Sequence, residues 1–191
     1  MRQACRSFFL NQMKTETQIY HPEPTFGHNF KVCLAIVAGA YFLWAVVHPD
    51  RWRLIDGVNL VIHEAGHLIF RPLGEFMTIA GGSLFQVLVP AIFAGYFYFN
   101  KKQFSSALVL FWVGASLLNV SVYAADSVLM QLPLLGGDNS IHDWNYMLDR
   151  LSLLRSTGAI AMAIRAFGTL TIIFATIWAL YTARRPSDAR L

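Results

Sequence analysis

The chain has 191 residues, of which 55% are hydrophobic and 14% are charged, and its mean hydropathy is +0.46. This composition excludes an ordinary soluble protein and indicates one integral membrane domain. The formal net charge is +4 and two cysteines are too few for a disulfide framework. We therefore expect the lipid bilayer as a partner and no nucleic acid.

Hydropathy and length predict an all-α, polytopic helical bundle with about five transmembrane helices. The predicted spans are about residues 29–47, 54–70, 83–99, 104–125 and 157–182. They form a membrane domain over residues 29–182, between an N-terminal surface arm (1–28) and a polar C-terminal tail (183–191). Basic residues flank both ends of the spans, which leaves the membrane orientation open. The oligomeric state is open as well.

One motif in the second predicted helix carries chemistry: His63-Glu64-Ala65-Gly66-His67 has the H-E-x-x-H pattern. On a helix the two histidines project from one face and can bind one Zn²⁺, while Glu64 can act on a water at the metal. Ionisable residues in an apolar segment are costly unless they have partners and a function. The motif therefore predicts hydrolysis within the bilayer.

A catalytic zinc site needs three protein ligands, so one more is expected outside the motif. The first candidate is Asp126, near the end of the fourth span, with Asn119 two helical turns before it on the same face. The alternative is His142, in the first turn of a helix predicted from residue 141 to about 154. Its neighbour Asp143 has two interpretations: it orients a ligating imidazole, or it favours the helix N-terminus.

The order of the spans brings these candidates together. If every span crosses in turn, the second returns across the membrane and carries His63 and His67 to the side where the first began. The fourth span then ends on that side with Asp126, and the connection that contains His142 follows it. All candidate ligands are therefore expected in the same half of the membrane.

Three other features have mainly structural interpretations. Asn59, one turn before the motif, is expected to hydrogen-bond between helices. Arg165, inside the fifth span, requires a carboxylate or an aqueous pocket. The glycine-punctuated connection 73–82 is either a plain connector or a short hairpin or re-entrant loop, whose edge would hold an extended peptide by strand addition.

These residues resemble the site-2 protease group of intramembrane zinc metalloproteases, particularly its compact bacterial branch. The resemblance covers roughly residues 54–126 and rests on the H-E-x-x-H motif, on Gly81-Gly82-Ser83 opening the next span, and on Asn119 preceding Asp126. It implies zinc bound by His63, His67 and Asp126, Glu64 as the general base and Asn119 as a substrate-positioning residue. The later motif departs from the family pattern in its spacing, so His142 remains an alternative ligand.

The resemblance implies a zinc-dependent intramembrane endopeptidase that hydrolyses a peptide bond in or near a transmembrane segment. Its substrate would be a membrane protein or peptide, and its expected location is the bacterial inner membrane. One alternative is a membrane zinc hydrolase acting on a lipid or small amphiphile. Another is a non-catalytic membrane scaffold with a degenerate zinc site.

Overall fold

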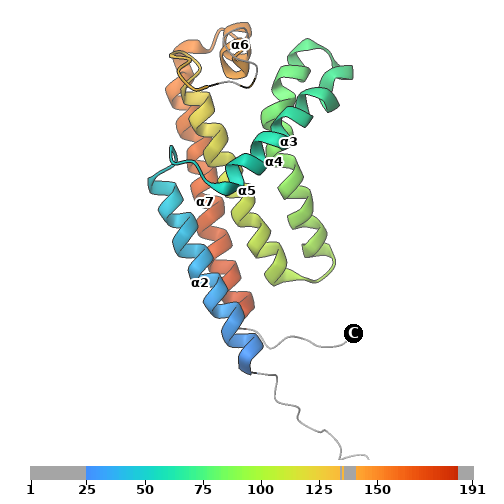
Figure 1. Ribbon diagram of the computed structural model, residues 1–191, viewed down its shortest axis with the longest axis vertical. Coiled ribbons are helices and arrows are strands. Elements are labelled where there is room, and N and C mark those ends of the chain that lie inside the picture. Colours follow the sequence, from blue (N-terminus) through green and yellow to red (C-terminus); the bar gives the residue numbers. More distant parts are fainter. Residues whose placement is uncertain (1–24, 134, 136–140, 185–191) are drawn as a thin grey trace, which may run out of the picture.

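The computed structural model describes residues 25–133, 135 and 141–184, and every regular element in this part of the chain is helical (Figure 1). The elements are α2 (Thr25–Val47), α3 (Leu54–Phe70), η1 (Arg71–Leu73), α4 (Glu75–Phe99), α5 (Gln103–Ala125), α6 (Asp143–Arg150), η3 (Leu154–Ser156) and α7 (Thr157–Ala183). The prediction of an all-α membrane bundle is confirmed. Most of the predicted arm and tail lies outside the described residues, although α2 begins inside the predicted arm.

Among the described residues, four helices are long and apolar enough to cross a membrane, rather than the five expected: Gly27–Val47, Glu75–Phe99, Gln103–Ala125 and Leu154–Ala183. The helix that carries the H-E-x-x-H motif, α3, is not among them. Its 17 residues extend only about 26 Å at 1.5 Å per residue, which is short of a hydrocarbon core of about 30 Å.

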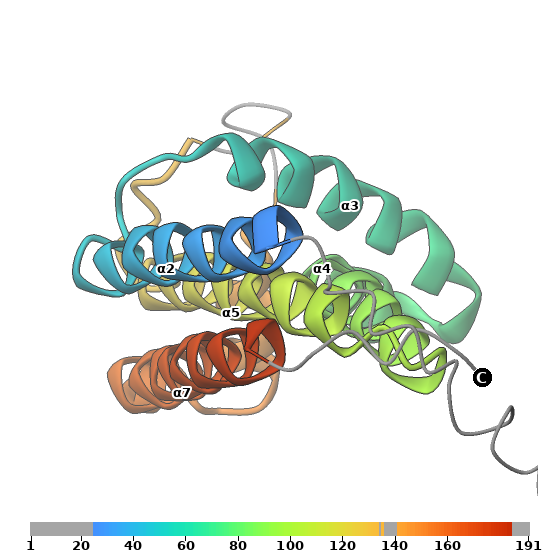
Figure 2. The ribbon, with the colours of Figure 1, turned by 90° about the horizontal axis from the view of Figure 1, so that it is seen from below.

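Helix α3 also runs in a different direction from the one expected. It starts about midway along the bundle and rises obliquely towards the end that carries α6, in the same sense as α2 (Figure 1). Seen end-on, α3 crosses the outside of the bundle, whereas α2, α5 and α7 run side by side (Figure 2). Because α3 does not return across the bundle, its basic N-terminal flank lies away from the turn between α4 and α5. The motif still reaches the end where α5 finishes.

The two faces of α3 explain why it packs obliquely. Its inward face is polar and buried, with Asp56, Asn59 and His63 at most 7% exposed. Its outward face is apolar and open, with Leu54 90% and Val61 71% exposed. This is the reverse of a helix on a water-soluble protein and suits an apolar environment outside and a polar interior.

A buried ion pair fixes the start of α3. The Arg53 backbone N–H and its Nε each donate to Asp56 Oδ2 at 2.9 Å. The carboxylate thereby caps an otherwise unpaired N–H of the chain entering the helix and neutralises the guanidinium beside it.

The connection after α3 is helical, not a hairpin or a re-entrant loop. A 3-10 turn, η1, follows α3 directly, and Gly74 reverses the chain with φ +96°, a conformation that other residues rarely adopt. Helix α4 then begins at Glu75 and includes most of the segment 73–82. A continuous helix satisfies the backbone hydrogen bonds of this apolar stretch within itself.

The bundle is held by small residues and by a few polar contacts. Helix α5 packs between α4 and α7, and α2 packs on α7. Asn59 Oδ1 accepts from Trp112 Nε1 (2.8 Å) and Ser116 Oγ (3.1 Å), which confirms its interhelical role. Arg165 donates to the Val46 carbonyl at 3.0 Å, so its partner is the C-terminal end of α2, where helix carbonyls favour a cation, and not a carboxylate.

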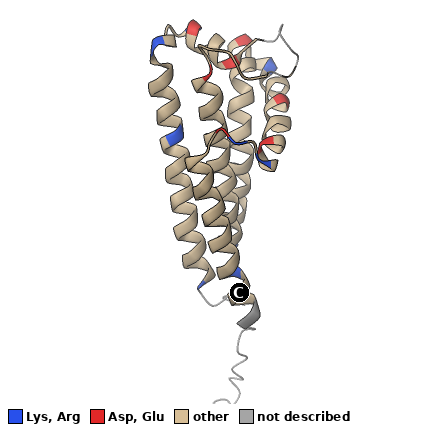
Figure 3. Cartoon of the chain, turned by 60° about the vertical axis from the view of Figure 1, so that its left-hand side comes forward, with Lys and Arg blue, Asp and Glu red and all other residues tan. Residues whose placement is uncertain are grey.

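Charged residues gather at the end that carries α6, and a long stretch of uncharged helix separates them from the opposite end (Figure 3). The α4–α5 turn, with Lys101 and Lys102, lies at that opposite end. The polar candidates for the site are therefore concentrated at one end of an apolar bundle.

Glycines let α3 and α4 approach closely, and this predicts the effect of a small substitution. A Cβ at Gly81 would lie 2.6 Å from Phe70 Cβ and 2.7 Å from the Gly66 carbonyl oxygen. We expect Gly81→Ala to destabilise the protein by about 1–3 kcal/mol, because neither neighbour is a flexible side-chain end. Gly95→Ala, in the same helix, is the matched control, since its nearest neighbour would be 3.9 Å away. Thermal unfolding in one detergent compares them, and equal stability of the two variants would contradict this packing.

Candidate metal centre

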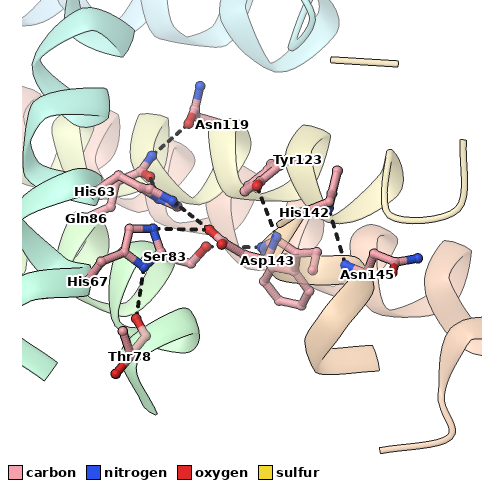
Figure 4. A network of polar contacts seen from close by, with 11 residues as sticks. His63, His67, Thr78, Ser83, Gln86, Asn119, Tyr123, His142, Asp143 and Asn145 are labelled. Carbon is pink, nitrogen blue, oxygen red and sulfur yellow. Dashed lines mark hydrogen bonds and ion pairs between the residues drawn. The ribbon is translucent and has the colours of Figure 1, made fainter. Parts of the chain in front are cut away.

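Two imidazoles and one carboxylate converge where α3, α4 and α6 meet (Figure 4). His63 Nε2 lies 2.9 Å and His67 Nε2 lies 3.4 Å from the same atom, Asp143 Oδ2. The centroids of the two imidazole rings are 4.8 Å apart, as expected for residues separated by one helical turn. One donor atom from each residue lies within 4.8 Å of the others, so the group can hold a metal ion.

The opposite side of each imidazole is held by a hydrogen-bond acceptor. His63 Nδ1 lies 3.1 Å from Gln86 Oε1, and His67 Nδ1 lies 2.9 Å from the Thr78 carbonyl oxygen. Both Nδ1 atoms therefore donate, which leaves each Nε2, on the side of Asp143, as the ring atom available to bind a metal. Helix α4 supplies both acceptors, so packing of α4 against α3 sets the orientation of both rings.

The Gln86 amide is itself oriented. Its Nε2 donates to Asn119 Oδ1 at 2.7 Å, so its oxygen must face His63. A chain of hydrogen bonds thus runs from Asn119 on α5 through Gln86 on α4 to His63 on α3. Asn119 acts on the imidazole through Gln86, a role that the sequence did not indicate.

The absence of a side chain at Gly82 keeps the space in front of the histidines open. A Cβ built there would lie 2.5 Å from His63 Nε2 and 2.7 Å from His67 Nε2. A methyl group there would therefore press on both imidazoles at the atoms that would bind a metal ion. Two imidazoles and a carboxylate form a ligand set found in catalytic zinc sites, so the residues present fit such an ion.

Without a metal, the three groups are coupled by charge. The hydrogen bond to Asp143 raises the pKa of His67 to about 9, against the effect of burial. Burial alone would raise the pKa of Asp143, but the hydrogen bonds from His63 and His67 outweigh it and lower that pKa. At neutral pH the metal-free site therefore contains an imidazolium–carboxylate pair whose proton a metal ion would displace.

Glu64 is exposed to the space beside this cluster. It lines a cavity of about 210 Å³ together with His63, His67, Tyr123 and Asp143. It also lines a neighbouring cavity of about 220 Å³ that includes Asn119 and Gln86 and extends to the linker between α2 and α3. The wall of the second cavity is mixed: Trp52, Leu60, Val122, Leu132 and Pro133 form its apolar part, and Asp50, Arg51 and Asp56 are charged groups near the linker.

The structure brings together some of the predicted site residues and separates others. His63, Glu64 and His67 lie together at the first cavity, and Asn119 lines the neighbouring cavity, which His63 and Glu64 also line. Asp126, the preferred third ligand, does not contact the two imidazoles, because it ends α5 and its oxygens accept from the Gln131 and Leu132 backbone N–H groups, each at 2.9 Å.

The alternative ligand, His142, is also directed elsewhere. Its Nε2 lies 3.3 Å from Asp126 Oδ2, and its Nδ1 accepts from the Asn145 backbone N–H. The carboxylate beside the two imidazoles belongs instead to Asp143, which the sequence suggested only as an orienting residue or a helix-terminus charge. Helix α6 is shorter than predicted and begins at Asp143, with His142 as its N-cap.

No role at the site was predicted for Gln86, Gly82 or Thr78, although the sequence around Gln86 and Gly82 gave some indication of one. Gln86 is a buried amide in an apolar helix, one turn after Gly82, and such residues usually have a specific partner. Gly82 was noted only as part of the opening of the next span. The Thr78 carbonyl has no sequence signal, because any residue type supplies one.

Comparison with known proteins adds no assignment. No family model, curated protein or solved structure matches this chain. A functional conclusion must therefore rest on the chemistry of the site.

The open space at Gly82 predicts that one methyl group blocks metal binding. We expect Gly82→Ala to lower zinc affinity by at least about tenfold, because the added carbon occupies the position where both Nε2 atoms must reach the ion. Gly95→Ala should bind zinc as the wild type does, since its Cβ meets no close neighbour. Zinc titration of the two purified variants measures this, and wild-type affinity in Gly82→Ala would place the metal elsewhere.

The raised pKa of His67 predicts a pH dependence of stability in the metal-free protein. The folded-state pKa of about 9 exceeds the ordinary histidine pKa of 6.5, so the stabilisation is complete below about pH 6.5 and is lost as the pH rises through about 9. Thermal unfolding in a chelator should show this loss in the wild type. Asp143→Asn removes the carboxylate that raises the pKa of His67. The wild type should therefore be more stable than this variant at low pH, and the difference should shrink between about pH 6.5 and 9. A difference that stays constant over this pH range would contradict the pairing of His67 with Asp143.

Proposed function

We propose that this protein is a zinc-dependent membrane hydrolase, with His63, His67 and Asp143 as the metal ligands and Glu64 as the general base. The observation that carries the proposal is the convergence of both Nε2 atoms on the Asp143 carboxylate, in front of a residue without a side chain. Acceptors behind both rings favour the neutral tautomers that bind metals through Nε2.

Zinc bound by these residues would supply Lewis acidity, lowering the pKa of water and polarising a substrate carbonyl. Glu64, on the cavity wall, is placed to take the proton from the attacking water and to return it to the leaving group. Asn119 lines the neighbouring cavity, which Glu64 also lines, and because its oxygen accepts from Gln86, its amide nitrogen is the atom that can donate to a substrate carbonyl. Together these groups suffice for hydrolysis of an amide or an ester.

We propose a peptide bond in or near a transmembrane segment as the target. The site lies in a bundle whose described part has four helices suited to cross a membrane, so its substrates would reach it from the bilayer or its surface. The cavity of about 220 Å³ beside Glu64 is the space in which the scissile bond of such a segment would lie.

One alternative is hydrolysis of a lipid or another small amphiphile, since Trp52, Leu60 and Val122 give the cavity that Glu64 lines a partly apolar wall. A non-catalytic scaffold would require that loss of Glu64 has no consequence. The resemblance to the compact bacterial branch of the site-2 proteases favours the peptidase and a location in the bacterial inner membrane.

Metal analysis tests the ligand set. We expect about one Zn²⁺ per chain in the wild type and a loss of most of it in His63→Ala, His67→Ala or Asp143→Ala, since each removes one of three ligands. Asp126→Ala should retain zinc at saturating metal, because its oxygens are engaged in the turn after α5. If only Asp126→Ala empties the site, Asp143 is not the third ligand.

Turnover tests the base. We expect Glu64→Gln to abolish hydrolysis of a membrane-peptide substrate while zinc stays bound, because the amide keeps the size of the side chain but cannot accept the proton. Glu75→Gln is the matched control, since Glu75 is exposed at the start of α4 and does not line the cavity. Parallel assays with a peptide and with an ester amphiphile distinguish the two substrate classes. Cleavage retained in Glu64→Gln would remove this residue as the base, and loss of zinc would make it a ligand.

A further inference from the structure

Asp126 and His142 form a contact that the proposed reaction does not use. His142 is 5% exposed, and its Nε2 lies 3.3 Å from Asp126 Oδ2. Because Nδ1 of this ring accepts from the Asn145 N–H, the proton lies on Nε2 and is donated to the carboxylate. A single imidazole therefore joins the end of α5 to the start of α6.

The position of Asp126 is itself fixed. Both of its carboxylate oxygens accept backbone N–H groups, from Gln131 and Leu132, each at 2.9 Å. The residue ends α5, a long helix that packs on α4 and α7. The acceptor that holds His142 thus stands at the end of a helix that is packed in the bundle.

Two further contacts join the same elements. The Asp143 backbone N–H donates to the Tyr123 hydroxyl oxygen at 3.2 Å, and Asn145 Nδ2 donates to the Ser127 carbonyl at 2.8 Å. The ring of His142 lies against that of Tyr123, with centroids 4.5 Å apart. We call the pair Asp126–His142, with these two contacts, the α5–α6 brace.

Helix α6 depends on such contacts because it has only eight residues, too few to be stable alone. On its other side it is held by α4, where Trp144 Nε1 donates to Ser83 Oγ at 3.1 Å and Met147 packs on Ile79 and Ala80. Asp143 is the first residue of this short helix. Its carboxylate reaches the two imidazoles only if the helix start is held in place.

We propose that Asp126 and His142 are positioning residues for metal binding, which hold the start of α6 so that the Asp143 carboxylate meets His63 and His67. This inference rests on the proposed function, since it assumes that Asp143 is a metal ligand. Their place is behind the ligand, and their effect on the metal passes through Asp143. Residues that orient a ligand in this way commonly change metal affinity by 10–100-fold.

The test is zinc affinity, measured by competition with a chelating dye on the full chain purified in detergent. We expect His142→Ala and Asp126→Ala each to weaken zinc binding by about tenfold or more. Asp149→Ala is the matched control, because Asp149 is exposed on the same helix, and it should bind zinc as the wild type does. His142→Asn, which keeps a side chain suited to an N-cap, should lose less affinity than His142→Ala and serves if the alanine variant does not fold.

A double-mutant cycle separates positioning from general damage. In the Asp143→Ala background, His142→Ala should cause no further loss of zinc affinity, since the group it positions is already absent. If His142→Ala lowers zinc affinity in the Asp143→Ala background by as much as it does in the wild type, His142 supports the fold in general and the inference is overturned. Wild-type affinity in both His142→Ala and Asp126→Ala would overturn it too. If Asp143→Ala itself binds zinc normally, the proposed ligand set fails, which is a different result from failure of the brace.

Discussion

The contact of two imidazoles with one buried carboxylate is the constraint on which the rest of this structure depends. A carboxylate in an apolar bundle is costly unless charges and hydrogen bonds offset its loss of hydration. Asp143 meets that condition through His63 and His67 at 2.9 and 3.4 Å. Each imidazole then needs an acceptor on its other side, and α4 provides both. The carboxylate of Asp143 and both nitrogens of each imidazole thus have a polar partner, and these contacts fix the orientation of the three side chains.

Helix packing makes this network possible. Helix α3 presents its polar residues inward and its apolar residues outward. The orientation of the helix about its own axis therefore accounts both for the burial of the polar cluster and for the exposure of the apolar face. Glycines at the contact let α4 approach closely enough for the Thr78 carbonyl and the Gln86 amide to reach the rings. Bulkier residues at Gly66 or Gly81 would separate the helices and leave both rings without their acceptors.

The three ligand-bearing groups therefore have different supports. His63 and His67 are neighbours on one helix, and their spacing is set by local geometry alone. Asp143 comes from a short helix 80 residues from His63 along the chain, and its place is set by contacts with α4 and α5. The spacing of the two nitrogen ligands is therefore set within one helix, whereas the position of the oxygen ligand depends on tertiary packing. The polar contacts around α6 supply that packing.

The H-E-x-x-H spacing determined the pair His63 and His67 and the neighbouring Glu64, because residues four apart meet on any helix. Hydropathy likewise determined the all-α membrane class. The direction of α3 followed only from tertiary packing, since 17 residues are at the lower length limit for a membrane span and the sequence does not tell a short span from a helix that lies across a bundle. The identity of the third ligand was decided by tertiary packing as well. Asp126 and Asp143 both lie at the end of the molecule that carries the site. Only the docking of α6 shows that Asp126 closes a turn while Asp143 faces the imidazoles. Local spacing is encoded in the sequence, whereas a contact between distant segments depends on how the intervening helices pack.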